Sequence, residues 1–298
     1  MKTLVVVNTM SGNSNKINID EIIKSFASKD DVYIKKLKKE NDDYSIKGFE
    51  KIIVCGGDGT IFNAMEKARN EKVIILYFPY GTLNERAQVN KNGKNLVKLN
   101  QMAESNEKPF AYVYAAGTFT EIAYKTKNKN KKKIKGLAYV LNVLKAYRVN
   151  NIEARIEAKG LNEESKYTLI MVLDSNQCFR FRFNRAYRFD ETSLFLLTIK
   201  SPGKDNLINR IKIFFPFFRV FFIGFSKDYK SKNITFTKTT TVNLMLKDTT
   251  VFCVDGERRE ESGQILIRKN NLLPRVFIGR IKKRYFKSNK TTSTKTIN

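Results

Sequence analysis

Histidine is missing altogether from this sequence of 298 residues, and acidic residues are scarce beside basic ones. Without histidine the chain can form neither a Ser-His-Asp triad nor a Cys-His dyad, nor a zinc site of the usual histidine-containing kind. Lysine and arginine number 56 against 29 aspartates and glutamates, which gives a net charge of +27. Two interpretations of this charge stay open. It attracts polyanions such as nucleic acid, nucleoside triphosphate or an anionic membrane, or it reflects a proteome rich in lysine and asparagine.

Cysteine is also scarce, and its three positions favour a reducing compartment. Cys55, Cys178 and Cys253 are odd in number, far apart and set in apolar runs. They are therefore predicted to be reduced core thiols of a cytosolic protein, and not a disulfide framework or a metal site. The first eight residues hold too short an apolar run for a signal peptide and predict a first β-strand instead. The chain length favours two domains.

The first hundred residues alternate between strand and helix signals. Apolar runs at 4–7, 51–54 and 73–78 predict buried strands, 32–37 predicts an edge strand, and 19–27 and 61–69 have helical spacing. This order predicts an α/β domain with a largely parallel sheet. In such domains ligands bind at the carboxyl ends of the strands.

From about residue 110 onward strand-like runs dominate, which predicts a β-sandwich or barrel appended to the first domain. The runs are 111–116, 152–158, 167–173, 179–183, 194–199, 233–236, 241–246 and 264–267, with helical segments only at 134–147 and 205–218. The lysine-rich stretch 125–135 is either a lid or membrane-facing patch or a solvated loop. The basic end, 280–298, is predicted to be frayed.

The segment 205–225 is strongly apolar, yet Lys212, Arg219 and Lys227 divide it into short uncharged runs. A membrane span needs about 20 apolar residues, so the segment is not predicted to cross a bilayer. Core packing is the favoured interpretation. The alternative is an aromatic and basic surface that contacts a bilayer.

The loop 56–60, Gly-Gly-Asp-Gly-Thr, follows an apolar strand and opens a helix. Its glycines let the backbone approach a ligand closely, and the N–H groups of the loop and of the helix start favour a phosphate. Asp58 in such a loop is costly unless a cation bridges it, which suggests Mg²⁺. The alternative is a plain strand-to-helix turn, which often contains one Gly-Asp pair.

This loop together with Asn63 resembles the nucleotide-binding signature of the diacylglycerol kinase catalytic domain family, although NAD kinases share the signature. Four further segments match that family in order: 8–12, with Thr9 where the family has proline, then 79–87, 116–139 and 254–257. The resemblance implies a phosphofructokinase-like α/β domain plus a β-sandwich, with the active site in the cleft between them. The implied domains are residues 1–110, joined by about 272–298, and residues 111–271.

The resemblance also implies a lipid kinase that transfers the γ-phosphoryl group of ATP to the hydroxyl of diacylglycerol or a related lipid. The residues expected to bind ATP are Asn8, Thr9, Met10, Ser11, Gly12, Gly56, Gly57, Asp58, Gly59, Thr60, Asn63 and Thr82. By resemblance Glu257 is the proton acceptor, and Asp255 lies beside it as base partner or metal contact. In an extended segment, residues i and i+2 face the same side, so both carboxylates are expected to point one way. A turn with two solvated acids is the alternative.

Family members in bacteria also have a structural Mg²⁺ loop, and 188–194 is the matching stretch. The resemblance implies a carboxylate from Glu191 or Asp190 and the backbone carbonyls of Arg188 and Ser193 as ligands. Glu85 and Glu191 stand where the family has aspartates. Glutamate is longer than aspartate by one methylene group. Either the two changes compensate each other, or the magnesium site is weakened.

Two other functions stay open: a soluble NAD-kinase-like enzyme, and a non-catalytic lipid- or nucleic-acid-binding protein on a decayed kinase scaffold. The lipid kinase interpretation implies a cytoplasmic protein that works peripherally at an anionic membrane surface. Bacterial relatives suggest a homodimer. A specific nucleic-acid partner is not expected, because charge alone supports one.

Overall fold

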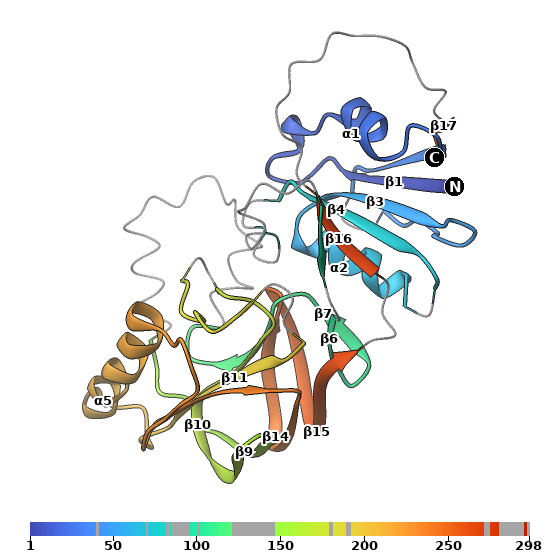
Figure 1. Ribbon diagram of the computed structural model, residues 1–298. Coiled ribbons are helices and arrows are strands. Elements are labelled where there is room, and N and C mark those ends of the chain that lie inside the picture. Colours follow the sequence, from blue (N-terminus) through green and yellow to red (C-terminus); the bar gives the residue numbers. More distant parts are fainter. Residues whose placement is uncertain are drawn as a thin grey trace. The chain divides into compact units, whose positions relative to one another are not determined.

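The computed structural model describes residues 1–39, 42–69, 71–81, 84, 87, 96–99, 102–120, 147–178, 181–188, 192–270, 275–279 and 295–296 (Figure 1). The chain divides into two compact units, Met1–Met102 with Asn270–Asn298, and Ala103–Lys269. The sequence had placed these boundaries at 110/111 and at about 272. Predictions made for Thr82, Glu85, Asp190, Glu191, for 125–135 and for most of 134–147 fall outside the described residues.

The first unit is built on a seven-stranded sheet in the order β17-β2-β1-β3-β4-β16-β5. All of its pairs are parallel except β5–β16. The strands are β1 (Lys2–Asn8), β2 (Asp31–Leu37), β3 (Lys51–Gly56), β4 (Ile74–Pro79), β5 (Leu96–Leu99), β16 (Arg275–Gly279) and β17 (Lys295–Thr296). The predicted edge position of the second strand is wrong, because β17 pairs with β2 on its outer side.

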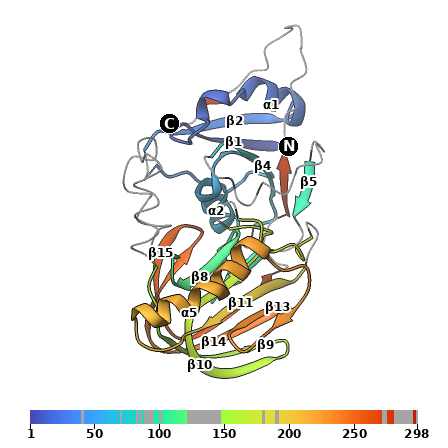
Figure 2. The same ribbon diagram turned by 90° about the vertical axis from the view of Figure 1, so that its left-hand side faces the viewer.

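Helices cover both faces of this sheet, α1 (Ile19–Phe26) on one and α2 (Asp58–Lys67) on the other (Figure 2). The strands' side chains alternate, so one set, including Val5, Ile53 and Leu76, packs with α1 in a single core. Asn18 caps α1 by accepting a hydrogen bond from the Glu21 N–H. The helix α2 begins at Asp58 and not at residue 61, so the glycine loop supplies its first turn.

The second unit is dominated by strands, as the sequence predicted. The strands are β6 (Met102–Ser105), β7 (Lys108–Phe110), β8 (Val113–Gly117), β9 (Ile152–Ala158), β10 (Leu161–Leu173), β11 (Leu194–Lys200), β12 (Tyr229–Lys230), β13 (Ile234–Thr239), β14 (Thr241–Val254) and β15 (Glu257–Asn270). They form one hydrogen-bonded sheet in the order β12-β13-β11-β10-β8-β14-β15-β6-β7. No strand is assigned over 181–183, where Phe181 makes only an isolated bridge to Cys178.

This sheet curls around its own core because β9 pairs with both β10 and β14. The first halves of β10 and β14 pair with β9, and their last residues pair with β8. Register shifts after Tyr167 in β10 and after Leu246 in β14 mark where the pairing changes. The enclosed core includes Tyr114, Ile170 and Phe252.

A helix and a π-helical turn lie on the outside of the second unit: α5 (Leu207–Phe218), which runs directly into η3 (Arg219–Ile223). In the part of the chain that the structure describes, no helix is long and apolar enough to cross a membrane. The three cysteines are buried thiols, and burial raises the pKa of Cys55 to about 12.

Candidate functional site

The loops with glycine and asparagine in the first unit meet at one edge of its sheet. Val7 of β1 pairs with Cys55 of β3, and Gly56 of β3 pairs with Pro79 of β4. Because these strands are parallel, their carboxyl ends lie side by side. This edge is where open α/β sheets bind ligands.

Hydrogen bonds tie the three loops into one framework. The Asn8 side chain donates to Thr60 Oγ1 (2.9 Å). Asn13 joins the first loop to the third, because its N–H donates to the Tyr80 carbonyl (2.9 Å) and its side chain to the Gly81 carbonyl (2.8 Å). Both Tyr80 and Gly81 donate their N–H groups to the Gly56 carbonyl. Of the predicted ATP-binding residues, Asn8 and Thr60 are therefore in direct contact.

Two of the glycines are required because neighbouring atoms leave no room for a Cβ. A Cβ at Gly81 would lie 2.5 Å from Gly57 Cα and 2.6 Å from Asn84 Oδ1. A Cβ at Gly56 would lie 2.4 Å from Thr60 Oγ1. At Gly59, by contrast, a Cβ would meet nothing within 4 Å, and this residue is exposed at the first turn of α2. The first two glycines thus hold the loops together, while Gly59 leaves a face of the loop open.

We expect Gly81→Ala to destabilise the first unit by roughly 1–3 kcal/mol, the usual cost of forced overpacking. The new methyl group would collide with the backbone of Gly57, which cannot rotate away as a side chain can. The midpoint of chemical denaturation checks this. Gly48→Ala is the comparison for packing, because a Cβ there meets nothing within 4 Å, although its φ of +78° adds backbone strain. An unchanged midpoint for Gly81→Ala would contradict the loop packing.

The N-terminus of α2 lies at the open face of the loop, beside Gly59. The first N–H groups of a helix have no partner within the helix, and the helix dipole adds partial positive charge there, so the position favours an anion. Thr60 is buried beside Asn8, whereas Asn63, a predicted ligand, is exposed one turn further along α2. Of 8–12 in the first loop, Thr9 donates through its N–H and its hydroxyl to the Leu37 carbonyl. Thr9 therefore anchors the loop to β2.

Asp58 has interactions within the protein that the sequence argument did not foresee. Burial first, and then the Asp58 carboxylate beside it, raise the pKa of the Tyr77 hydroxyl well above its ordinary value. Asp58 also lies in the first turn of α2, where the helix dipole stabilises a negative charge. These interactions stabilise an aspartate in this loop, and the Mg²⁺ suggested for Asp58 stays a prediction.

In the second unit, Asp255 and Gly256 form the two-residue turn between β14 and β15. Both have positive φ, +52° and +87°, which is the pattern of a type I′ hairpin turn. The Asp255 carboxylate is buried and accepts three backbone hydrogen bonds, from the N–H groups of Ala111, Tyr112 (2.9 Å) and Val113 (3.1 Å). It therefore holds the chain where β7 leads into β8.

Glu257 lies just after this turn and is exposed at the start of β15. The extended geometry from which the sequence argument placed both carboxylates on one side is wrong, because the turn buries Asp255 and leaves Glu257 at the surface. An exposed carboxylate beside a rigid turn is accessible to a substrate hydroxyl. The roles assigned to the two residues stay predictions.

Of the predicted magnesium ligands, the structure describes Arg188 and Ser193. The Arg188 guanidinium donates to the carbonyls of Arg185 (3.0 Å) and Tyr187 (3.1 Å), which precede the predicted loop. Ser193 is buried next to β11. Among the described residues, no group of three or more Cys, Asp or Glu side chains could hold a metal ion.

The structure adds a buried ion pair that no sequence motif indicated. Asp174 and Lys269 form a salt bridge with side chains 0% and 4% exposed. The Asp174 N–H donates to the Tyr112 carbonyl (3.0 Å), so this pair adjoins the segment that Asp255 holds. Buried ion pairs are costly unless well matched. The pair therefore belongs to the framework that fixes residues 111–113.

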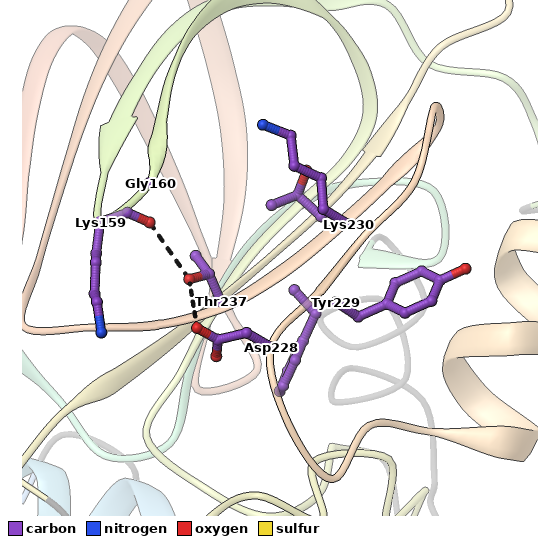
Figure 3. A pocket seen from close by; sticks show the side chains of 8 residues that line it. Lys159, Gly160, Asp228, Tyr229, Lys230 and Thr237 are labelled. Atoms are coloured by element: carbon purple, nitrogen blue, oxygen red, sulfur yellow. Dashed lines mark hydrogen bonds between the residues drawn. The ribbon is translucent and has the colours of Figure 1, made fainter.

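A separate pocket of about 300 Å³ lies in the second unit between the β9–β10 turn and β12–β13 (Figure 3). Its described lining residues, Lys159, Gly160, Asp228, Tyr229, Lys230, Thr235, Phe236 and Thr237, include none of the predicted site residues. Asp228 accepts a hydrogen bond from the Lys238 N–H (2.9 Å) and lies 3.4 Å from Thr237 Oγ1. The Asp228 carboxylate is thus part of the pocket wall, and this pocket is separate from the predicted site residues.

Comparison with known families gives a match over residues 2–115, which are most of the first unit and the start of the second. Residues 2–115 match the model of the diacylglycerol kinase catalytic domain. This segment is therefore similar to a diacylglycerol kinase catalytic domain. It contains all three loops at the sheet edge and ends just beyond residues 111–113. The sequence matches no curated protein.

Solved structures share the fold of the whole chain. A diacylglycerol kinase from Bacillus anthracis strain Sterne is 18% identical with a TM-score of 0.63, and a second, provisionally assigned one is 20% identical with 0.65. Each match covers 93% of this chain and 96% of the other. An NAD kinase from Archaeoglobus fulgidus, solved with ATP, is 11% identical with a TM-score of 0.50, and the match covers 94% of both chains. At these identities the comparisons show the two-domain fold alone, which both kinase types share.

Proposed function

We propose that the protein is a lipid kinase that transfers the γ-phosphoryl group of ATP to the hydroxyl of diacylglycerol or a related lipid. The observation that carries the proposal is the match of residues 2–115 to the diacylglycerol kinase catalytic domain. The three glycine and asparagine loops of that segment join at one sheet edge. The α2 N-terminus and the open face at Gly59 would take the phosphates. We also propose that the first unit has a phosphofructokinase-like fold.

Phosphoryl transfer needs the nucleotide held in place and the acceptor hydroxyl deprotonated. In the proposed reaction the substrate oxygen bonds to the γ-phosphorus, the bond to ADP breaks, and the hydroxyl proton passes to Glu257. Asp255 holds the turn that presents Glu257 and takes no proton itself, since three backbone N–H groups already bind its carboxylate. Magnesium would accompany the triphosphate and offset its charge. We assign it to no residue of this chain.

Measuring ATP consumption with dioleoylglycerol in mixed micelles, and separately with NAD, tests the substrate. Turnover with the lipid and none with NAD supports the proposal. Turnover with NAD alone would instead establish the soluble NAD-kinase function, which the shared fold leaves open. A chain that binds ATP but consumes it with neither substrate would be a non-catalytic kinase scaffold.

Gly59→Ala separates nucleotide binding from folding. The added methyl group meets no protein atom within 4 Å, so we expect the denaturation midpoint to stay close to that of the wild type. The same methyl group occupies the open face where the phosphates would approach, so we expect ATP affinity to fall by about tenfold or more. Calorimetric titration with ATP measures it. Unchanged affinity would show that the ATP phosphates bind away from this turn.

A further inference from the structure

The helix α5 and the turn η3 are apolar on their outer side as well as on the side that packs against the second unit. The inner face is formed by Ile213, Pro216, Phe217 and Val220, which are buried at helical spacing. The outer face is apolar too, with exposed fractions of 45–74% at Leu207, Ile208, Ile211, Phe214, Phe215, Phe218, Phe222 and Ile223. A helix that is apolar all round belongs in a core or a membrane. The core-packing interpretation is therefore wrong for these eight side chains.

The unit holds this helix firmly, so the exposure does not come from a loose segment. Phe217 contacts the rings of Phe119 and Tyr147, and the Tyr147 hydroxyl donates to the Arg210 carbonyl (2.7 Å). At the other end, Gly224 adopts a φ of +70°, and a Cβ there would lie 2.6 Å from the Phe183 carbonyl oxygen. The helix α5, which carries the outer apolar face, is thus held on the outside of the second unit (Figures 1 and 2).

A second segment extends this face and adds positive charge. The Phe181 ring, 41% exposed, contacts those of Phe221 and Phe222. Three exposed arginines, at 182, 185 and 188, follow Phe181 in the same loop. The loop is joined to the end of η3, since the Arg185 N–H donates to the Phe225 carbonyl (2.8 Å). We call the eight outer side chains together with Phe181 the aromatic face.

The charges within the segment 206–227 have one sign. No aspartate or glutamate occurs there, whereas Lys212 and Lys227 are exposed. Acids flank the segment on both sides: Asp205 is paired with Arg210 (2.6 Å), and the exposed Asp228 accepts a hydrogen bond from the Lys238 N–H (2.9 Å). Such a cationic rim attracts an anionic partner, and it would make two copies of the face repel each other.

We propose that the aromatic face inserts into the surface of a bilayer that contains anionic phospholipid. Apolar side chains enter the boundary between headgroups and acyl chains, and the surrounding lysines and arginines contact the phosphates. The inference rests on the proposed function, because the contact would bring the enzyme to a substrate held in the membrane. Its test requires neither ATP nor diacylglycerol.

Sedimentation with vesicles of equal parts phosphatidylcholine and phosphatidylglycerol measures the binding, with pure phosphatidylcholine vesicles alongside. We expect the wild type to bind the mixed vesicles, and to bind the neutral ones much more weakly. The double variant Phe215→Gln, Phe222→Gln should lose at least about tenfold in partitioning, because it removes two exposed rings from the insertion face. Leu266→Gln, an exposed apolar residue on β15, is the matched control and should bind as the wild type does.

The denaturation midpoint of the double variant separates a lipid partner from a protein one. It should stay unchanged, since both rings are exposed. A lower midpoint would show that the two rings pack within the unit, and a dimer that dissociates in the variant on analytical ultracentrifugation would show that a second copy covers the face. Either result would overturn the proposal. Equal binding by wild type and double variant would overturn it as well.

An activity measurement keeps this proposal distinct from the proposed function. With dihexanoylglycerol dissolved as monomers, the double variant should match the wild type, whereas with dioleoylglycerol in the mixed vesicles its rate should fall with its binding. If the wild type binds the vesicles but phosphorylates neither lipid, the lipid kinase function fails and the membrane surface stands. If it phosphorylates both lipids but does not bind, the reverse holds.

Discussion

A Glu257→Gln variant is expected to fold as the wild type does and to lose phosphoryl transfer by about two to four orders of magnitude, the usual contribution of general acid–base catalysis. Glutamine keeps the size of the side chain but cannot accept the proton of the attacking hydroxyl. Since Glu257 is exposed at the start of β15, the substitution changes no core packing. The loss should appear in kcat, with ATP affinity unchanged, because the nucleotide loops lie elsewhere in the chain.

Glu260→Gln is the matched control for that variant. Glu260 is an exposed glutamate on the same strand, and its partner Arg258 is exposed too. Surface pairs of this kind contribute little to stability, so neither kcat nor the denaturation midpoint should change. If Glu257→Gln keeps near-full activity, another group takes the proton. If both variants lose activity alike, the effect is one of surface charge and the assignment fails.

The nucleotide site is the part of this protein that its sequence predicts best, because its signals are local. Each loop directly follows an apolar strand, and parallel strands bring such loops to one edge. The start of α2 was placed too late because Asp58, Gly59 and Thr60 have low helix propensity. Packing of Thr60 beside Asn8 and the position of Asp58 at the positive helix end outweigh that propensity.

Other features could not be predicted, for two different reasons. The Asp174–Lys269 pair joins residues 95 positions apart, so only the folded sheet brings them together. In α5 apolar residues occur at inner and outer positions alike, so their spacing does not separate an inner from an outer side. The turn at Asp255 and Gly256, in contrast, was predictable: an Asp-Gly pair between two strand-like runs is a strong hairpin signal. The sequence argument took residues 255–257 as extended, and it therefore predicted both carboxylates on one side.

Asp255→Ala is expected to destabilise the second unit by roughly 3 kcal/mol or more, because each buried hydrogen-bonding group left without a partner costs about 1–3 kcal/mol. It removes the acceptor of the Ala111, Tyr112 and Val113 N–H groups. It also puts alanine at a φ of +52°, which costs roughly another 1 kcal/mol. Chemical denaturation followed by far-ultraviolet circular dichroism measures the loss. Activity should fall as well, since the turn that presents Glu257 is no longer fixed.

Asp255→Asn separates the carboxylate from the turn. Asparagine favours the same positive φ, so the hairpin geometry is kept and only the charge and one acceptor oxygen are lost. We therefore expect a midpoint between those of Asp255→Ala and the wild type, with activity recovering in step with stability. Were Asp255 instead a base or a metal ligand, Asp255→Asn would fold like the wild type and still lose kcat as Glu257→Gln does. Stability and kcat measured on the same pair of variants thus decide whether Asp255 takes part in the chemistry or holds residues 111–113 in place.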